Sequence, residues 1–151
     1  MNIVIHCDGL CEPKNPGGYA CWAWVVTEGT VAQAFGCVAH GPEATNNMAE
    51  YAAVEDALLW CVAHQIRAPF LYTDSQLVAN QVNGVWACHA PRLQPLCAWV
   101  QVLLEQTGAT LEWVPREQNE VADALSRTAY EWARLGYFRA SDILSFSQDP
   151  R

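Results

Sequence analysis

The stretch Asn2-Ile-Val-Ile-His-Cys-Asp-Gly9 decides how this chain is expected to fold. Its β-branched residues predict a short strand over residues 2–7, which ends at Asp8-Gly9 and runs into a proline- and glycine-rich loop. Two more strand-like segments follow at residues 19–27 and 31–40, and the Glu28-Gly29-Thr30 sequence between them is a hairpin signal. The chain therefore opens with a predicted three-stranded antiparallel meander.

Beyond the meander, helical periodicity alternates with short strand signals. We expect helices at residues 47–62, 75–82, 91–106 and 119–135, and strands at residues 69–73 and 109–114. This order predicts an α/β fold, with a five-stranded mixed sheet whose first three strands are antiparallel and with helices on both faces. We assign residues 1–135 to one domain and leave residues 136–151 as an unassigned tail.

Composition narrows the class of protein. The 151 residues suit one domain, and 52% hydrophobic with 16% charged residues excludes disorder for the bulk of the chain. The longest apolar run, residues 19–26, is eight residues long, too short to cross a membrane, and the amino terminus lacks the features of a signal peptide. We expect a soluble, cytoplasmic monomer with no membrane partner.

The cysteines and the net charge add two constraints. Seven cysteines, without a Cys-x-x-Cys pair, indicate reduced thiols in the core, with a structural zinc site as the alternative. The net charge of −8 argues against a protein that holds nucleic acid by a general positive field, so any such function requires a local site. The seven tryptophans are interpreted as core residues.

Two aspartates stand where predicted strands end. Asp8 follows the first strand, and Asp74 follows the strand at residues 69–73. The carboxyl ends of strands are where open sheets usually bind ligands. Taken singly, each is better explained as a solvated aspartate, Asp8 at a strand end and Asp74 in a turn.

Two further acids lie on predicted helices. Glu50 shares the apolar stripe of its helix, so it needs a partner, although a capping box with Asn47 as N-cap explains it equally well. Asp123 opens the last helix and can pair with Arg127 one turn later, as on any surface helix. Two like charges about 4 Å apart repel by about 4 kcal/mol at an effective dielectric near 20, so convergence of these acids requires cations or a bound proton. Hard divalent ions suit such ligands, and the four widely spaced histidines do not suggest zinc.

Four short blocks in this order resemble type 1 ribonuclease H and cover about residues 3–130. They are Asp8-Gly9 with Asn15-Pro16-Gly17-Gly18, Thr45-Asn46-Asn47-Met48-Ala49-Glu50, Tyr72-Thr73-Asp74-Ser75-Gln76 and Asn119-Glu120-Val121-Ala122-Asp123. The resemblance implies the ribonuclease H-like fold. It also implies an endonuclease that cuts the RNA strand of RNA/DNA hybrids with two Mg²⁺ or Mn²⁺ ions and leaves 5′-phosphate and 3′-hydroxyl ends.

The resemblance also assigns roles to individual residues. The family's catalytic, metal-binding acids match Asp8, Glu50, Asp74 and Asp123. Residues that contact the hybrid in the family match Asn15, Asn46, Asn47 and Gln76, and Thr45 matches a position that helps to hold a DNA-strand phosphate. Helix capping is the competing explanation for Asn46 and Asn47.

The chain departs from the best-known members in two loops. Arg116 stands where those members have a mobile histidine, and we expect it to contact a phosphate of the substrate. Residues 84–96 hold one basic residue, Arg92, so the basic protrusion of some members is missing. These features resemble a subgroup found in archaea and some bacteria.

Three other functions remain as alternatives. One is a non-catalytic nucleic-acid-binding module of the same fold, against which the four acids count, because they repel phosphates. Another is a related nuclease that also acts on double-stranded RNA. A 3′ to 5′ exonuclease is disfavoured because Asp8-Gly9-Leu10 lacks the glutamate of that group's Asp-x-Glu pair.

Overall fold

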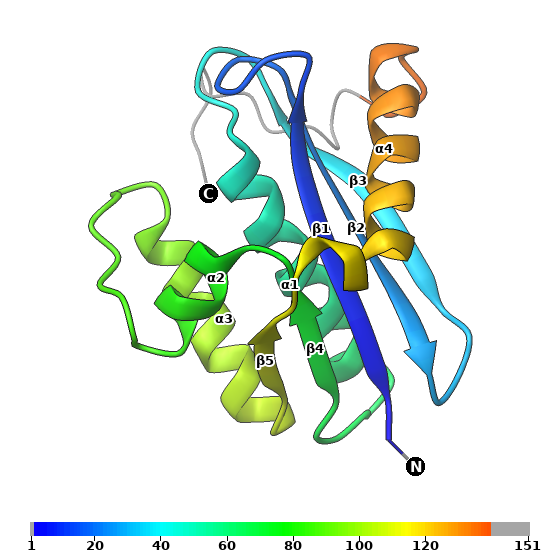
Figure 1. Cartoon of the computed structure of the whole chain (residues 1–151), viewed down its shortest axis with the longest axis vertical. Coiled ribbons are helices and arrows are strands. Elements are labelled where there is room, and N and C mark those ends of the chain that lie inside the picture. Colours follow the sequence, from blue (N-terminus) through cyan, green and yellow to red (C-terminus); the bar gives the residue numbers. More distant parts are fainter. Residues whose placement is uncertain (1, 140–151) are drawn as a thin grey trace.

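The computed structural model describes residues 2–139, which form a twisted sheet with helices on both faces (Figure 1). The strands are β1 (Val4–Glu12), β2 (Tyr19–Glu28), β3 (Gln33–His40), β4 (Phe70–Thr73) and β5 (Thr110–Trp113), and their order across the sheet is β3-β2-β1-β4-β5. β1, β2 and β3 are antiparallel neighbours, whereas β4 is parallel to β1 and β5 is parallel to β4. The predicted five-stranded mixed sheet is confirmed.

Four α-helices lie in the described part of the chain: α1 (Asn46–Ala63), α2 (Gln76–Val82), α3 (Gln94–Thr107) and α4 (Glu120–Arg134). A 3₁₀ turn, η1 (Arg116–Gln118), separates β5 from α4. α1 packs on β1 and β2 with α3 beside it, while α4 covers β1, β2 and β3 from the opposite face. The long central strand β1 is therefore in contact with helices on both sides.

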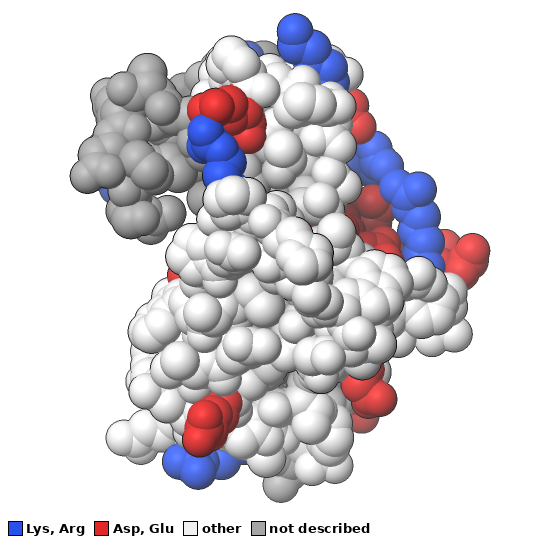
Figure 2. Space-filling model, turned by 90° about the vertical axis from the view of Figure 1, so that its left-hand side faces the viewer, with Lys and Arg blue, Asp and Glu red and all other residues white. Residues whose placement is uncertain are grey.

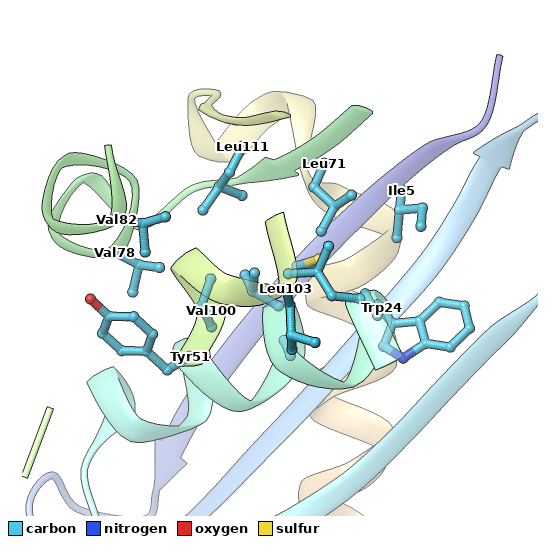
Figure 3. Close-up of a cluster of buried hydrophobic side chains, with 14 of the residues drawn as sticks. Ile5, Trp24, Tyr51, Leu71, Val78, Val82, Val100, Leu103 and Leu111 are labelled. Atoms are coloured by element: carbon cyan, nitrogen blue, oxygen red, sulfur yellow. The ribbon is translucent and has the colours of Figure 1, made fainter. Parts of the chain in front are cut away.

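Alternation along β1 assigns its side chains to the two faces. Ile5 and Cys7 are fully buried in the main core, which strands share with α1, α2 and α3 (Figure 3). The side chain of Asp8 points the other way and reaches α4. On α1, the stripe predicted from helical periodicity is fully buried: Ala53, Val54, Ala57, Leu58 and Cys61.

The predicted end of the first strand was wrong. β1 does not end at Asp8-Gly9 but continues to Glu12, because every residue from Ile5 to Glu12 has a partner on β2. Gly9 is not a strand-terminating residue here; its missing side chain makes room for α1, whose Glu50 nitrogen would lie 2.3 Å from a Cβ at this position. Asp8 therefore lies inside the sheet.

The N-cap of α1 rules out the capping-box alternative for Glu50. Thr45, in an extended conformation, is the N-cap, and its Oγ1 accepts a hydrogen bond from the Met48 amide at 3.2 Å. Asn46 and Asn47 are the first two helical residues, so neither of them is the N-cap. Glu50 consequently lies too far into the helix for a capping box with Asn47.

Smaller predictions had mixed outcomes. α3 begins at Gln94 rather than residue 91, whereas α2 begins at Gln76, with Ser75 as its N-cap, close to the predicted start at residue 75. Of the seven tryptophans only Trp24 is buried in the core, so the prediction that all are core residues was wrong. All seven cysteines are free thiols, and six are buried.

Residues 140–151 of the expected tail lie outside the described part, and the domain boundary at residue 135 stays a prediction. Within residues 2–139, no helix combines the length and the apolar character that a membrane crossing requires.

Candidate active site

Three of the predicted acids meet at the centre of the sheet. Asp8 comes from β1, Glu50 from α1 and Asp74 from the end of β4, and each offers a carboxylate oxygen within 4.8 Å of the others. Among the described residues, no histidine or cysteine belongs to this group, so the zinc alternative finds no support there. The side-chain oxygens form the type of ligand set that hard divalent cations prefer.

Glu50 is a buried acid with one carboxylate oxygen that lacks a donor. Its Oε1 atom is shielded from solvent and has no hydrogen-bond partner. Burial, followed by the charges of Asp8 and Asp74, raises the pKa of Glu50 well above its ordinary value, while the Gly9 amide and Arg116 oppose that shift. A buried carboxylate oxygen without a donor is costly unless a cation or a proton satisfies it.

The pKa of Asp8 is also raised, although its carboxylate accepts a hydrogen bond from a serine hydroxyl. Burial and the neighbouring charge of Asp74 raise its pKa to about 8, and a hydrogen bond from Ser126 opposes the shift. Ser126 Oγ lies 2.7 Å from Asp8 Oδ2 and comes from α4. Without a bound cation, the cluster therefore retains at least one proton at neutral pH.

The fourth acid, Asp123, lies at the edge of the same site. It is half-buried on the first turn of α4, and its Oδ2 accepts a hydrogen bond from Arg127 Nε at 3.3 Å, the pairing expected from their spacing. It lies outside the group of three, yet all four acids line one open cavity of about 430 Å³. The structure thus brings together all four acids nominated from the sequence.

Three of the predicted substrate-binding residues line this cavity as well: Asn15, Asn46 and Arg116. Asn15 Nδ2 donates to Asn46 Oδ1 at 2.7 Å, and Asn15 Oδ1 accepts from the Asn46 amide at 3.1 Å. This reciprocal pair fastens the loop after β1 to the first residue of α1. Arg116, on η1, adds a positively charged side chain to the lining of the cavity.

The remaining candidates lie elsewhere. Thr45 and Asn47 line a neighbouring cavity of about 340 Å³ together with Arg92. Arg92 forms an ion pair with Glu43, with 2.6 Å between Nη2 and Oε1. Gln76 is exposed at the start of α2 and lines neither cavity.

The face formed by α2, α3 and the loop between them is nearly free of charged side chains (Figure 2). Along α3, Glu105 is the single charged residue. This agrees with the missing basic protrusion inferred from residues 84–96.

Sequence reasoning missed two residues that connect β1 with α4. Asn119 is 1% exposed and donates from Nδ2 to the Cys7 carbonyl oxygen at 2.9 Å. Ser126 is fully buried and donates to Asp8. The only available signal was their spacing around Asp123, which lies one helical turn before Ser126.

The metal-free protein is expected to lose stability between pH 6.5 and pH 8. The pKa of Asp8 is about 8 in the fold against an ordinary 3.8, so the folded state keeps a proton that the unfolded state has released. The free energy of unfolding should therefore fall by up to about 1.4 kcal/mol per pH unit, less steeply as the pH approaches 8, and Glu50 acts in the same direction. Thermal unfolding in EDTA at several pH values measures this slope.

Added Mn²⁺ should weaken the pH dependence of the free energy of unfolding, because a bound cation replaces the retained proton. Replacing Asp74 with asparagine should flatten it without metal, whereas Glu112→Gln, an exposed carboxylate on β5, should leave it unchanged. A melting temperature in EDTA that is constant or rises over this range would contradict the assignment.

Comparisons with known proteins agree with this geometry. A family model described as "Reverse transcriptase-like" matches residues 6–129. The structure of an N-terminal RNase H domain from Mycobacterium tuberculosis, solved as a fusion with maltose-binding protein, is 32% identical with a TM-score of 0.79, covering 91% of this chain and 99% of that one. RNase H1 of the archaeon Halobacterium salinarum is 32% identical with a TM-score of 0.73, covering 87% and 98%. This chain belongs to the ribonuclease H family.

A further solved structure and the full-length curated relatives widen the comparison. LC11-RNase H1, solved in complex with an RNA/DNA hybrid, is 26% identical with a TM-score of 0.75, covering 88% of this chain and 99% of that one. A bifunctional protein of M. tuberculosis is 34% identical over 139 residues, 88% of this chain and 36% of that protein. This chain thus spans about a third of the length of the first curated relatives it matches.

Proposed function

We propose that this chain is a type 1 ribonuclease H that hydrolyses the RNA strand of RNA/DNA hybrids with Mg²⁺ or Mn²⁺. The observation that carries the proposal is the group of Asp8, Glu50 and Asp74, whose carboxylate oxygens lie within 4.8 Å of one another. A protein that only binds nucleic acid gains nothing from negative charge where phosphates must approach.

The residues present fit divalent cations. All donors are carboxylate oxygens, and the buried Glu50 Oε1 has no other partner in the described structure. The raised pKa of Asp8 follows from burial and from the charge of Asp74, the repulsion that a cation relieves. Asp8, Glu50 and Asp74, with Asp123 across the cavity, would hold the ions.

The reaction assigned to this site is hydrolysis at phosphorus that leaves a 5′-phosphate and a 3′-hydroxyl. Two ions held by the acids would supply an activated water and would stabilise the attacking and leaving oxygens. The chain itself contributes a half-open cavity in which the scissile phosphate can approach the acids from solvent.

Recognition of the RNA strand is assigned to amides. An RNA strand differs from DNA by its 2′-hydroxyl, which is displayed in a wide and shallow minor groove of the hybrid. Because Asn46 Oδ1 accepts from Asn15, the Asn46 NH₂ group is turned away from that bond and can donate to a 2′-hydroxyl. The contact with the hybrid would extend beyond the acid-lined cavity. Thr45 and Asn47 line the neighbouring cavity, and Gln76 is exposed at the start of α2.

Arg116 is assigned to a substrate phosphate near the scissile bond. Its guanidinium lines the acid cavity and is exposed, so it can approach a phosphate without losing a buried partner. An Arg116→Ala variant should lose about 10- to 100-fold in kcat/KM on a hybrid, in line with about 1.5–3 kcal/mol for a charge-assisted hydrogen bond. Steady-state cleavage at low salt measures this loss.

The matched control is Arg67→Ala, which makes the same charge change beside α1 and α3, away from the acids. We expect it to cleave like the unchanged chain, and Arg116→Lys to recover part of the rate. An Arg116→Ala variant with unchanged kinetics would contradict the assignment of Arg116 to a substrate phosphate.

The experiment that tests the proposed function is cleavage of an end-labelled RNA/DNA hybrid at low salt with Mg²⁺ or Mn²⁺. Single-stranded RNA, duplex RNA and duplex DNA serve as parallel substrates. Internal cuts confined to the RNA strand of the hybrid support the proposal, and cuts in duplex RNA would widen the substrate class. Binding of the hybrid without any cutting would instead indicate a binding module.

A further inference from the structure

Ser126 lies on α4, where the helix contacts Asp8 of the acid cluster. It is fully buried, and its Oγ is 2.7 Å from Asp8 Oδ2 and 2.8 Å from the backbone oxygen of Asp123. The two acids belong to different elements, β1 and α4, and one hydroxyl is within hydrogen-bond distance of both residues.

The ordinary explanation of such a serine is a hydrogen bond back to its own helix. A serine inside a helix often donates to the carbonyl three or four residues earlier, and Asp123 is in that position. A hydroxyl has one proton, however, so it donates to one acceptor at a time. An ionised carboxylate is a stronger acceptor than an amide carbonyl, so the proton goes to Asp8 whenever Asp8 is charged.

Two side-chain hydrogen bonds connect α4 with β1 next to the site. The side chain of Asn119, at the N-terminus of α4, donates to the Cys7 carbonyl oxygen, the residue before Asp8. Ser126 provides the second connection, two turns further along the helix and directly to the Asp8 side chain. The backbone of β1 and the carboxylate of Asp8 are thus each fastened to the helix that carries Asp123.

We propose that Ser126 is a positioning residue for the metal site: its hydroxyl holds one oxygen of Asp8 against α4 so that the carboxylate is oriented for a divalent cation shared with Glu50 and Asp74. This inference rests on the metal site of the proposed function. Groups that hydrogen-bond to metal ligands fix ligand orientation, and their removal costs about 10- to 100-fold in metal affinity or activity. Ser126 gives this chain such a group on the helix opposite Glu50.

The test is Mn²⁺ binding to the free protein by titration calorimetry, without nucleic acid. Ser126→Ala removes the hydroxyl, and Ser126→Cys keeps a side chain of similar size with a weak donor. We expect both variants to bind Mn²⁺ about 10- to 100-fold more weakly. The half-saturating Mn²⁺ concentration for hybrid cleavage should rise by the same factor, with a smaller change in the rate at saturating metal.

The matched control is Thr128→Ala on the same helix. Its exposed hydroxyl donates to the Ala124 carbonyl oxygen at 3.3 Å and touches none of the acids, so Mn²⁺ affinity should not change. Thermal unfolding in EDTA checks that each variant is folded, and the Cys variant retains the packing if the Ala variant is unstable.

The outcomes separate this inference from the proposed function. If the unchanged chain binds no Mn²⁺, or if Ser126→Cys binds it as tightly as the unchanged chain does, the positioning role is overturned. If both Ser126 variants bind Mn²⁺ weakly while the unchanged chain cuts no hybrid, the positioning role stands and the proposed function fails.

Discussion

An Asp74→Asn variant is expected to lose hybrid cleavage by about 1,000-fold or more while keeping its fold, because metal ions contribute several kcal/mol of transition-state stabilisation. Asp74 is half-buried at the end of β4, and its charge is a cause of the raised pKa of both Asp8 and Glu50. Asparagine keeps the shape of the side chain but removes the charge that holds a cation.

The same substitution should make the metal-free protein more stable, because it removes like-charge repulsion inside the cluster. Cleavage of a labelled hybrid and thermal unfolding in EDTA measure the two effects on the same preparation. Glu112→Gln, with the same change in net charge at an exposed position, is the control and should alter neither quantity. Retention of more than a tenth of the activity in Asp74→Asn would contradict the assignment of this acid.

Gly9→Ala is expected to damage both the fold and the site. An added Cβ would lie 2.3 Å from the Glu50 nitrogen and 2.4 Å from the Ala49 carbonyl carbon, both backbone atoms of α1. Because backbone cannot rotate away, α1 must shift from β1, and overpacking of this kind costs about 1–3 kcal/mol or more. A displacement of Glu50 by about 1 Å would add a loss of about 100-fold in activity.

Urea unfolding and hybrid cleavage at a temperature where the variant is folded separate these two effects. The control is Gly36→Ala, where an added Cβ would meet ring atoms of Trp22 at 2.7 Å. Those atoms belong to a partly exposed side chain rather than to backbone, so we expect a smaller loss of stability and of activity than in Gly9→Ala. Wild-type stability and activity in Gly9→Ala would refute the close packing of α1 on β1.

The ends of elements show where sequence patterns stop being informative. The hydrophobic periodicity of α1 correctly predicted its buried stripe, because burial repeats every three to four residues in any amphipathic helix. It did not predict the cap, since Asn47 and Thr45 are both good N-cap residues and backbone conformation decides between them. Likewise, Gly9 is a turn residue by propensity but lies within a strand that β2 pairs along its length.

The sequence by itself determined the order of the elements and nominated the four acids, because periodicity and short motifs are local properties. Only the tertiary structure decided that Asp8, Glu50 and Asp74 lie within 4.8 Å of one another, and that Glu50 is left with an unpartnered oxygen. The contact between Asp8 and Ser126 joins residues 118 positions apart. No local pattern encodes it, because it arises only where α4 packs across β1 and buries both side chains together.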